Sequence, residues 1–215
     1  IAPGLRDVLL TGKVKEATTR TDNGRPVYDA VMLDAPPTGR IGRFLNVTAE
    51  TARLAKVGPI KSQSEGVASL LRSSLTAVHV VTLLEEMPVQ ETLDGIAELR
   101  AAKLPTGGIF INMVRPEELP QSALEAALKG RFDVDELALG LKAANLADGD
   151  EARRLAEALA TEVLEHARRT QLERRERTLL AKTGLPRYEL PLLTEGVDLA
   201  GLYELAEVIR EQGAA

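Results

Sequence analysis

An acidic side chain at the end of an apolar run is the feature of this sequence that best fits chemistry. Residues 28–34 read Tyr-Asp-Ala-Val-Met-Leu-Asp, which predicts a strand ending at Asp34. A carboxylate at the carboxyl edge of a parallel sheet lies where open α/β folds bind their ligands. There it can hold a hydrated magnesium ion beside nucleotide phosphates. An aspartate that only caps the next turn fits the pattern equally well.

The loop after Asp34 combines stiff and permissive residues. Pro36 and Pro37 restrict the backbone, and Thr38 and Gly39 follow them directly. This order suits a loop that changes position according to whether a phosphate is bound.

Further apolar runs predict the elements that position such a site. Residues 76–84 are almost wholly apolar and rich in β-branched side chains, which is typical of a buried parallel strand. A helical period separates this run from a second strand at 107–113, and this spacing predicts a βαβ unit. Residues 187–193 predict a last short strand, and 198–212 predict a closing helix.

Residues 117–184 lack strand signals and are dominated by Ala, Leu, Glu and Arg. We therefore predict an α/β fold with a doubly wound, mainly parallel sheet formed by residues 1–116 and 185–215, and a helical subdomain inserted at 117–184. Apolar residues in or near the insertion could line a groove for an apolar helix, but we favour a small core of its own. They are Met87, Met113, Leu119, Leu124, Leu128, Phe132, Leu137, Leu139 and Leu141.

Composition excludes several classes of function. The 215 residues include no cysteine, so disulfides, thiolate metal sites and thiol catalysis are excluded. The net charge of -5 and the scarcity of aromatic residues argue against nucleic-acid binding. No apolar run approaches the roughly 20 residues that cross a bilayer, so we expect a cytoplasmic protein. His79 and His166 have no second metal ligand spaced near them, so we expect structural roles for both.

The run 28–43 resembles the second switch of the arsenite-pump and tail-anchored-protein-targeting (ArsA-type) ATPase family. Those proteins read Tyr-Asp, an apolar strand and then Asp-Thr-Ala-Pro-Thr-Gly-His-Thr-Leu-Arg, where this chain has Asp-Ala-Pro-Pro-Thr-Gly-Arg-Ile-Gly-Arg. Segments 1–4, 80–92, 109–114 and 190–193 follow the same family order. The chain is thus similar to this family over nearly its whole length. The general character of its sequence is similar to that of the family's actinobacterial branch.

The resemblance implies a P-loop-type ATPase that binds ATP and magnesium. Asp34 would hold the magnesium through a water molecule, and Thr38 and Gly39 would lie in the switch that senses the γ-phosphate. Asn112 would hydrogen-bond the adenine edge, since an amide can both donate and accept. Pro191 and Leu192 would pack near the base. The family also implies a homodimer or a heterodimer with a related ATPase, and an apolar helix or membrane protein as client.

Three departures from the family limit this comparison. No Gly-x-x-x-x-Gly-Lys phosphate loop occurs in the chain. Because the sequence begins at Ile1, we expect the loop to precede it, and we expect this chain alone to be inactive. Arsenite binding needs soft thiolate ligands, and the chain has no cysteine. Arg40 and Gly42 stand where the family often has histidine and leucine.

Two alternatives to an ATP-driven switch remain. One is a non-catalytic regulatory or scaffold subunit that pairs with an intact ATPase chain. The other is a partition or site-placement ATPase of the P-loop class, which a membrane-binding carboxyl terminus would favour, but residues 198–215 carry no basic face.

Overall fold

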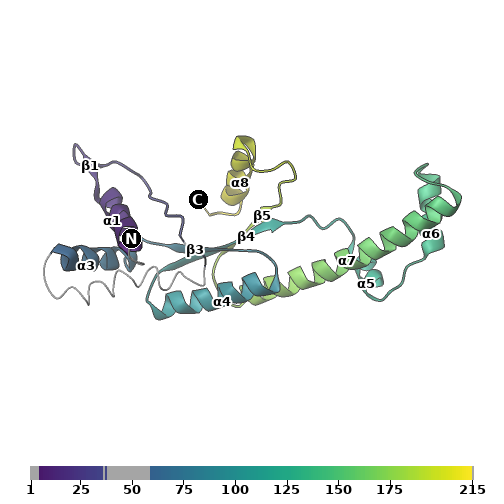
Figure 1. Cartoon of the computed structure of the whole chain (residues 1–215), viewed down its shortest axis with the longest axis horizontal. Helices are drawn as coiled ribbons and strands as arrows, with labels where there is room; N and C mark the ends of the chain where they lie inside the picture. Colours follow the sequence, from purple (N-terminus) through teal and green to yellow (C-terminus); the bar gives the residue numbers. More distant parts are fainter. Residues whose placement is uncertain (1–4, 36, 38–58, 215) are drawn as a thin grey trace.

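The computed structural model describes residues 5–35, 37 and 59–214 of the chain. Its centre is a three-stranded sheet of β3 (Val78–Thr82), β4 (Thr106–Val114) and β5 (Arg187–Pro191) in the order β3-β4-β5. Both pairs of neighbours are parallel. Helix α4 (Glu86–Ala101) joins β3 to β4, and together they form the predicted βαβ unit (Figure 1).

One face of the sheet forms the main core. Val80 and Thr82 of β3 are buried, and so are Ile109 and Ile111 of β4, because alternate side chains of a strand share a face. These strands pack with α4, with α3 (Pro59–Leu71) and with the end of α7 (Gly149–Ala181). The buried cluster consists of Val67, Leu71, Val80, Leu84, Val89, Ile96, Leu99, Leu104, Ile109, Ile111 and Leu180.

The opposite face of the sheet is more open. The rings of His79, Phe110 and Tyr188 follow one another across the three strands, with centroid separations of 5.5 and 5.1 Å. Val81 on this face is 63% exposed. Helix α8 (Leu199–Glu211) contacts β5 and lies on the side of the sheet away from α4 (Figure 1).

Gly108 allows the ring of Tyr188 to lie against β4. A Cβ atom at this position would come within 2.7 Å of the Tyr188 ring and 3.2 Å of the Pro186 carbonyl oxygen.

We expect Gly108→Ala to lower the free energy of unfolding by about 1–3 kcal/mol, the usual cost of overpacking. Gly140→Ala is the control, because a Cβ there meets nothing within 4 Å. In a helix interior it should be neutral or stabilising by up to about 1 kcal/mol. Urea unfolding of both variants checks this, and equal midpoints would contradict it.

Three helices connect β4 to β5: α5 (Gln121–Leu128), α6 (Val134–Ala143) and α7. The 33-residue α7 extends away from the sheet, and α5 and α6 pack along its outer part (Figure 1). A second buried cluster holds these helices together, made of Leu124, Ala127 and Ala167 with Leu119, Leu128, Phe132 and Val163 against it. Four of the nine residues considered for a groove therefore serve the region's own core. Met87, Met113 and Leu139 are exposed.

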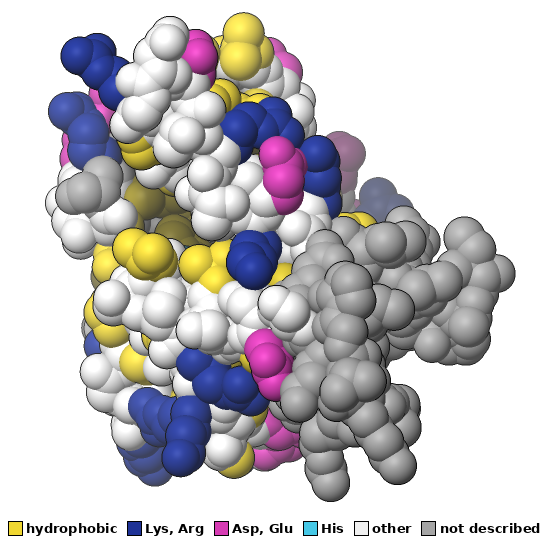
Figure 2. Space-filling model, turned by 90° about the vertical axis from the view of Figure 1, so that its left-hand side faces the viewer, with side chains coloured by type: hydrophobic (Ala, Val, Ile, Leu, Met, Phe, Trp, Pro, Cys, Tyr) yellow, Lys and Arg dark blue, Asp and Glu magenta, His cyan; other side chains and the backbone are white. Residues whose placement is uncertain are grey.

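The amino-terminal part consists of α1 (Leu5–Thr19) and a small hairpin of β1 (Thr21–Asp22) and β2 (Arg25–Pro26). Asn23 and Gly24 both have positive φ, of 50° and 78°, as a tight two-residue turn requires. Helix α1 packs against α3. Figure 2 views the molecule from the side on which α1 and α3 lie in Figure 1. It shows hydrophobic side chains in a recess of this surface.

The prediction of a strand at 28–34 is wrong for this structure. Residues 28–34 have no ladder partner in the described part of the chain, and Asp34 is exposed. The alternation of a strand is nevertheless present, because Val31 and Leu33 are half-buried while Met32 is 96% exposed. A strand needs a neighbour for its backbone hydrogen bonds, and an apolar pattern does not supply one. Residues 47–57, whose sequence also predicts a helix, lie outside the described residues.

Candidate functional site

The carboxyl ends of the parallel strands meet at one edge of the sheet, where open α/β folds bind ligands. Val114, the last residue of β4, is paired with Pro191, the last residue of β5. The Leu192 N–H donates to the Val114 carbonyl oxygen at 2.9 Å. Asn112 lies two residues before Val114. The structure thus makes neighbours of the ends of β4 and β5, the two strand ends on or next to which the predicted site residues Asn112, Pro191 and Leu192 lie.

The backbone turns sharply beside Asn112. Met113 has a positive φ of 57°, and the pairing of β4 with β5 shifts between Ile111 and Val114. The Met113 N–H donates to Asn112 Oδ1 at 3.0 Å, which uses the amide oxygen and fixes the plane of the amide. Within the described part of the chain, Asn112 Nδ2 makes no hydrogen bond, so this amide can donate to a ligand.

The corner formed by Asn112, Pro191 and Leu192 at the ends of β4 and β5 is open to solvent. Asn112, Pro191 and Leu192 are half-buried, and Met113 is 53% exposed. A planar apolar group could lie against Pro191 and Leu192 while the Asn112 amide donates to an acceptor on its edge. A purine base has this combination of a flat apolar face and ring-nitrogen acceptors.

Asp34 is not in the arrangement predicted for it. Its side chain is exposed and follows an unpaired segment rather than a strand. The preceding residue, Leu33, packs against the main core, so the segment reaches the body of the molecule at this point. Thr38 and Gly39 lie outside the described residues.

The described residues contain no group of three or more His, Asp or Glu side chains that could hold a metal ion. A magnesium ion on nucleotide phosphates needs only one or two protein carboxylates, because the phosphates and water supply its other ligands. The exposed carboxylate of Asp34 is compatible with that requirement.

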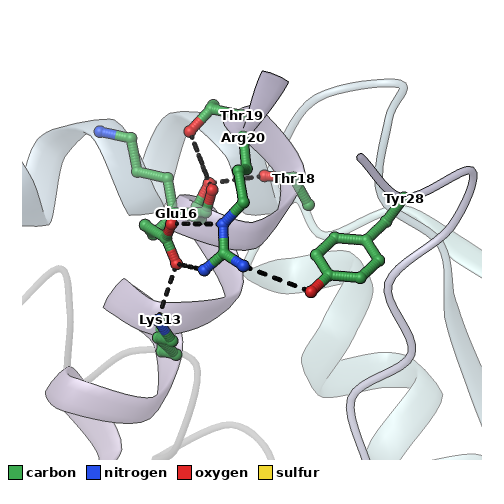
Figure 3. A network of polar contacts seen from close by, with 7 residues as sticks. Lys13, Glu16, Thr18, Thr19, Arg20 and Tyr28 are labelled. Atoms are coloured by element: carbon green, nitrogen blue, oxygen red, sulfur yellow. Dashed lines mark hydrogen bonds and ion pairs between the residues drawn. The ribbon is translucent and has the colours of Figure 1, made fainter. Parts of the chain in front are cut away.

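The sequence analysis missed a polar network that holds the segment leading to Asp34. Arg20, just after α1, makes a two-pronged contact with Glu16 and donates to Tyr28 Oη at 3.3 Å (Figure 3). Lys13 also bonds to Glu16, at 2.9 Å. Glu16 and Arg20 are four residues apart, which places them on one helix face, and this spacing was the signal available in the sequence.

The Arg20 and Lys13 hydrogen bonds lower the pKa of Glu16 from 4.5 to about 2. Because the pKa is lowered by folding, we expect the network to be complete above about pH 4.5, the usual value for a glutamate. It should be lost only as the pH falls towards 2. An NMR titration of the Glu16 carboxyl carbon checks this, and a midpoint near 4.5 would contradict it.

His79 has a structural role, as expected. Its Nδ1 accepts a hydrogen bond from the Gly108 N–H at 3.0 Å, which links β3 to β4.

A separate groove of about 510 Å³ lies between α5, α6 and α7 and has mostly apolar side chains, among them Leu137 and Leu141. No helix in the described ranges is both long and apolar enough to cross a membrane.

No protein-family model matches the chain. The chain is 49% identical over 216 residues to ATPase BagA of Mycobacterium tuberculosis (strain ATCC 25618 / H37Rv). The alignment covers 99% of this chain but only 62% of that relative. The identity and both coverages are the same for Mb3704 of Mycobacterium bovis (strain ATCC BAA-935 / AF2122/97). The name of that protein describes it as an inferred ATPase. The chain is therefore homologous to proteins named as ATPases, and it spans 62% of their length.

Proposed function

We propose that this chain is the larger part of an ATP-binding and ATP-hydrolysing nucleotide-switch protein of the ArsA-type family. The observation that carries the proposal lies at the carboxyl edge of a parallel sheet. There Val114, two residues after Asn112, pairs with Pro191 and accepts a hydrogen bond from the Leu192 N–H. Homology to proteins named as ATPases independently supports the ATPase part of the proposal.

In this proposal the adenine base lies against Pro191 and Leu192. Asn112 Nδ2 donates to a ring nitrogen, while its Oδ1 stays bonded to the Met113 N–H. The bond to Met113 fixes the amide before the ligand arrives, so less side-chain freedom is lost on binding. This contact selects the base and contributes to affinity rather than to the chemical step.

The chemical step is attack of water on the γ-phosphate. Magnesium, when bound, neutralises developing charge on the phosphate oxygens. Asp34 would hold this ion through a water molecule, and Thr38 and Gly39 would belong to the loop that responds to the γ-phosphate. This chain contains no Gly-x-x-x-x-Gly-Lys, so the proposal assigns the phosphate-binding loop to none of its residues.

The switch works as a dimer in the cytoplasm, either with a second copy or with a related ATPase. The groove between α5, α6 and α7 is the surface for an apolar helix of a client. This chain has no cysteine and therefore supplies no thiolate ligand for arsenite.

A non-catalytic regulatory or scaffold subunit that pairs with an intact ATPase chain is the second candidate. Steady-state ATP hydrolysis by a natural protein of the relatives' full length separates the two. Magnesium-dependent turnover is expected for the enzyme. Binding of ATP without turnover, unless a partner chain is added, would favour the non-catalytic subunit.

A further inference from the structure

The segment that carries Asp34 is attached to the rest of the molecule at both ends. At its far end, Leu33 packs against the main core. At its near end, Tyr28 lies against Arg20, which follows α1 directly (Figure 3). The direction in which Asp34 leaves the core surface therefore depends on where Arg20 holds Tyr28.

Arg20 makes several contacts at this point. Its Nε and Nη2 donate to the two carboxylate oxygens of Glu16 at 2.8 and 2.7 Å, which orients the guanidinium group. Its Nη1 donates to Tyr28 Oη, and its Cζ lies 5.7 Å from the centre of the Tyr28 ring. Its carbonyl oxygen accepts from the Val27 N–H at 3.0 Å, which closes the hairpin. One residue thus joins α1, the hairpin and the start of the Asp34 segment.

Helix α1 is itself held in a defined place. Thr11 of α1 and Ser64 of α3 are each only 2% exposed. Lys15 of α1 lies so close to Gly66 of α3 that a Cβ at Gly66 would meet its side chain. Because α3 contributes Val67 to the main core, the position of Arg20 is defined relative to that core.

We propose that Arg20 is a positioning residue for Asp34. It fixes Tyr28 on the end of α1 and so determines where residues 29–34 run between the hairpin and the core. This inference rests on the proposed function for the role of Asp34, but the attachment itself can be measured without it.

The attachment can be tested in this chain because it has no native cysteine. Spin labels at Ala35→Cys and Glu98→Cys, both exposed positions, report the distance between the Asp34 segment and α4. We expect Arg20→Ala to broaden the distance distribution about twofold, since the segment gains freedom at one end. Arg20→Lys keeps the positive charge but loses the planar guanidinium group, so it should broaden the distance distribution less. This variant replaces Arg20→Ala in the test if Arg20→Ala fails to fold.

Lys13→Ala is the matched control. Lys13 also bonds to Glu16, but Tyr28 contacts Arg20 and not Lys13 in the network of Figure 3. The control should leave the distribution unchanged. An unchanged distribution in both Arg20 variants, or equal broadening in the control, would overturn the proposal.

The consequence for function is tested in the full-length protein. We expect Arg20→Ala to lower kcat about tenfold or more with KM within about twofold, because misplacing a catalytic group by an ångström is costly while nucleotide binding is remote. Lys13→Ala should keep both constants. Broadening without a fall in kcat, or a rise in KM alone, would overturn the positioning role. If the wild type shows no hydrolysis, the proposed function fails, and the distance measurement still decides whether Arg20 holds the segment.

Discussion

Replacement of Asp34 by asparagine is expected to abolish ATP hydrolysis by the full-length protein and to leave its fold intact. The amide is nearly isosteric but has no negative charge, so it holds a magnesium-bound water poorly. Loss of several kcal/mol of transition-state stabilisation corresponds to a fall in kcat of about a hundredfold or more. The side chain of Asp34 is exposed, and therefore its change should not affect packing.

Asp29→Asn is the matched control for this experiment. Asp29 is an exposed acid of the same unpaired segment, so its replacement changes the net charge by the same amount. It should retain wild-type turnover. Turnover by Asp34→Asn equal to that of the control would remove Asp34 from the mechanism, and thermal unfolding of both variants would show whether folding is preserved.

Replacement of Asn112 by alanine is expected to weaken ATP binding by about tenfold or more and to leave pyrophosphate binding unchanged. The variant loses the hydrogen bond to the base and leaves the acceptor on the base without a partner, which costs about 1–3 kcal/mol. Pyrophosphate has no base and does not reach this corner. Isothermal titration of the full-length protein with each ligand measures the difference, and equal weakening of both would refute the adenine role.

Asn112→Asp refines the same test. Aspartate keeps an oxygen for the Met113 N–H, so the turn at the end of β4 should be preserved. It has no N–H to donate to the base. If the donor matters, Asn112→Asp should weaken ATP as much as Asn112→Ala does. Normal ATP affinity in this variant would show that only the turn is required.

Several helices and strands could be predicted from the apolar period of their own residues. The run 76–84 contains β3, the run 107–113 falls within β4, and residues 198–212 contain α8, each close to its observed ends. In these segments local propensity and the apolar period agree.

The segment 28–34 shows what the sequence could not reveal. Its apolar alternation survives as alternating burial, yet it has no ladder partner in the described part of the chain. Pairing depends on which element lies beside a segment, and that information is not local. The same limit applies to Arg20 and Tyr28, because a contact across a hairpin follows from the turn at Asn23 and Gly24 rather than from either residue alone.

The corner of the candidate site was only partly predictable. The resemblance assigned Asn112, Pro191 and Leu192 to the base, and the structure adds that β4 and β5 are neighbours with Val114 beside Pro191. The bond from the Met113 N–H to Asn112 Oδ1 depends on a positive φ at a non-glycine residue, which no sequence pattern indicates. This bond fixes the plane of the amide and leaves the Nδ2 donor directed away from the Met113 N–H.

Photolabelling with 8-azido-ATP tests most directly whether the base lies at this corner. The full-length protein is irradiated with the probe, digested and mapped by mass spectrometry, with unlabelled ATP as competitor. Labelling that ATP suppresses is expected in peptides containing Asn112 or residues 190–193. Suppressible labelling confined to other peptides would contradict the assignment of the base to the ends of β4 and β5.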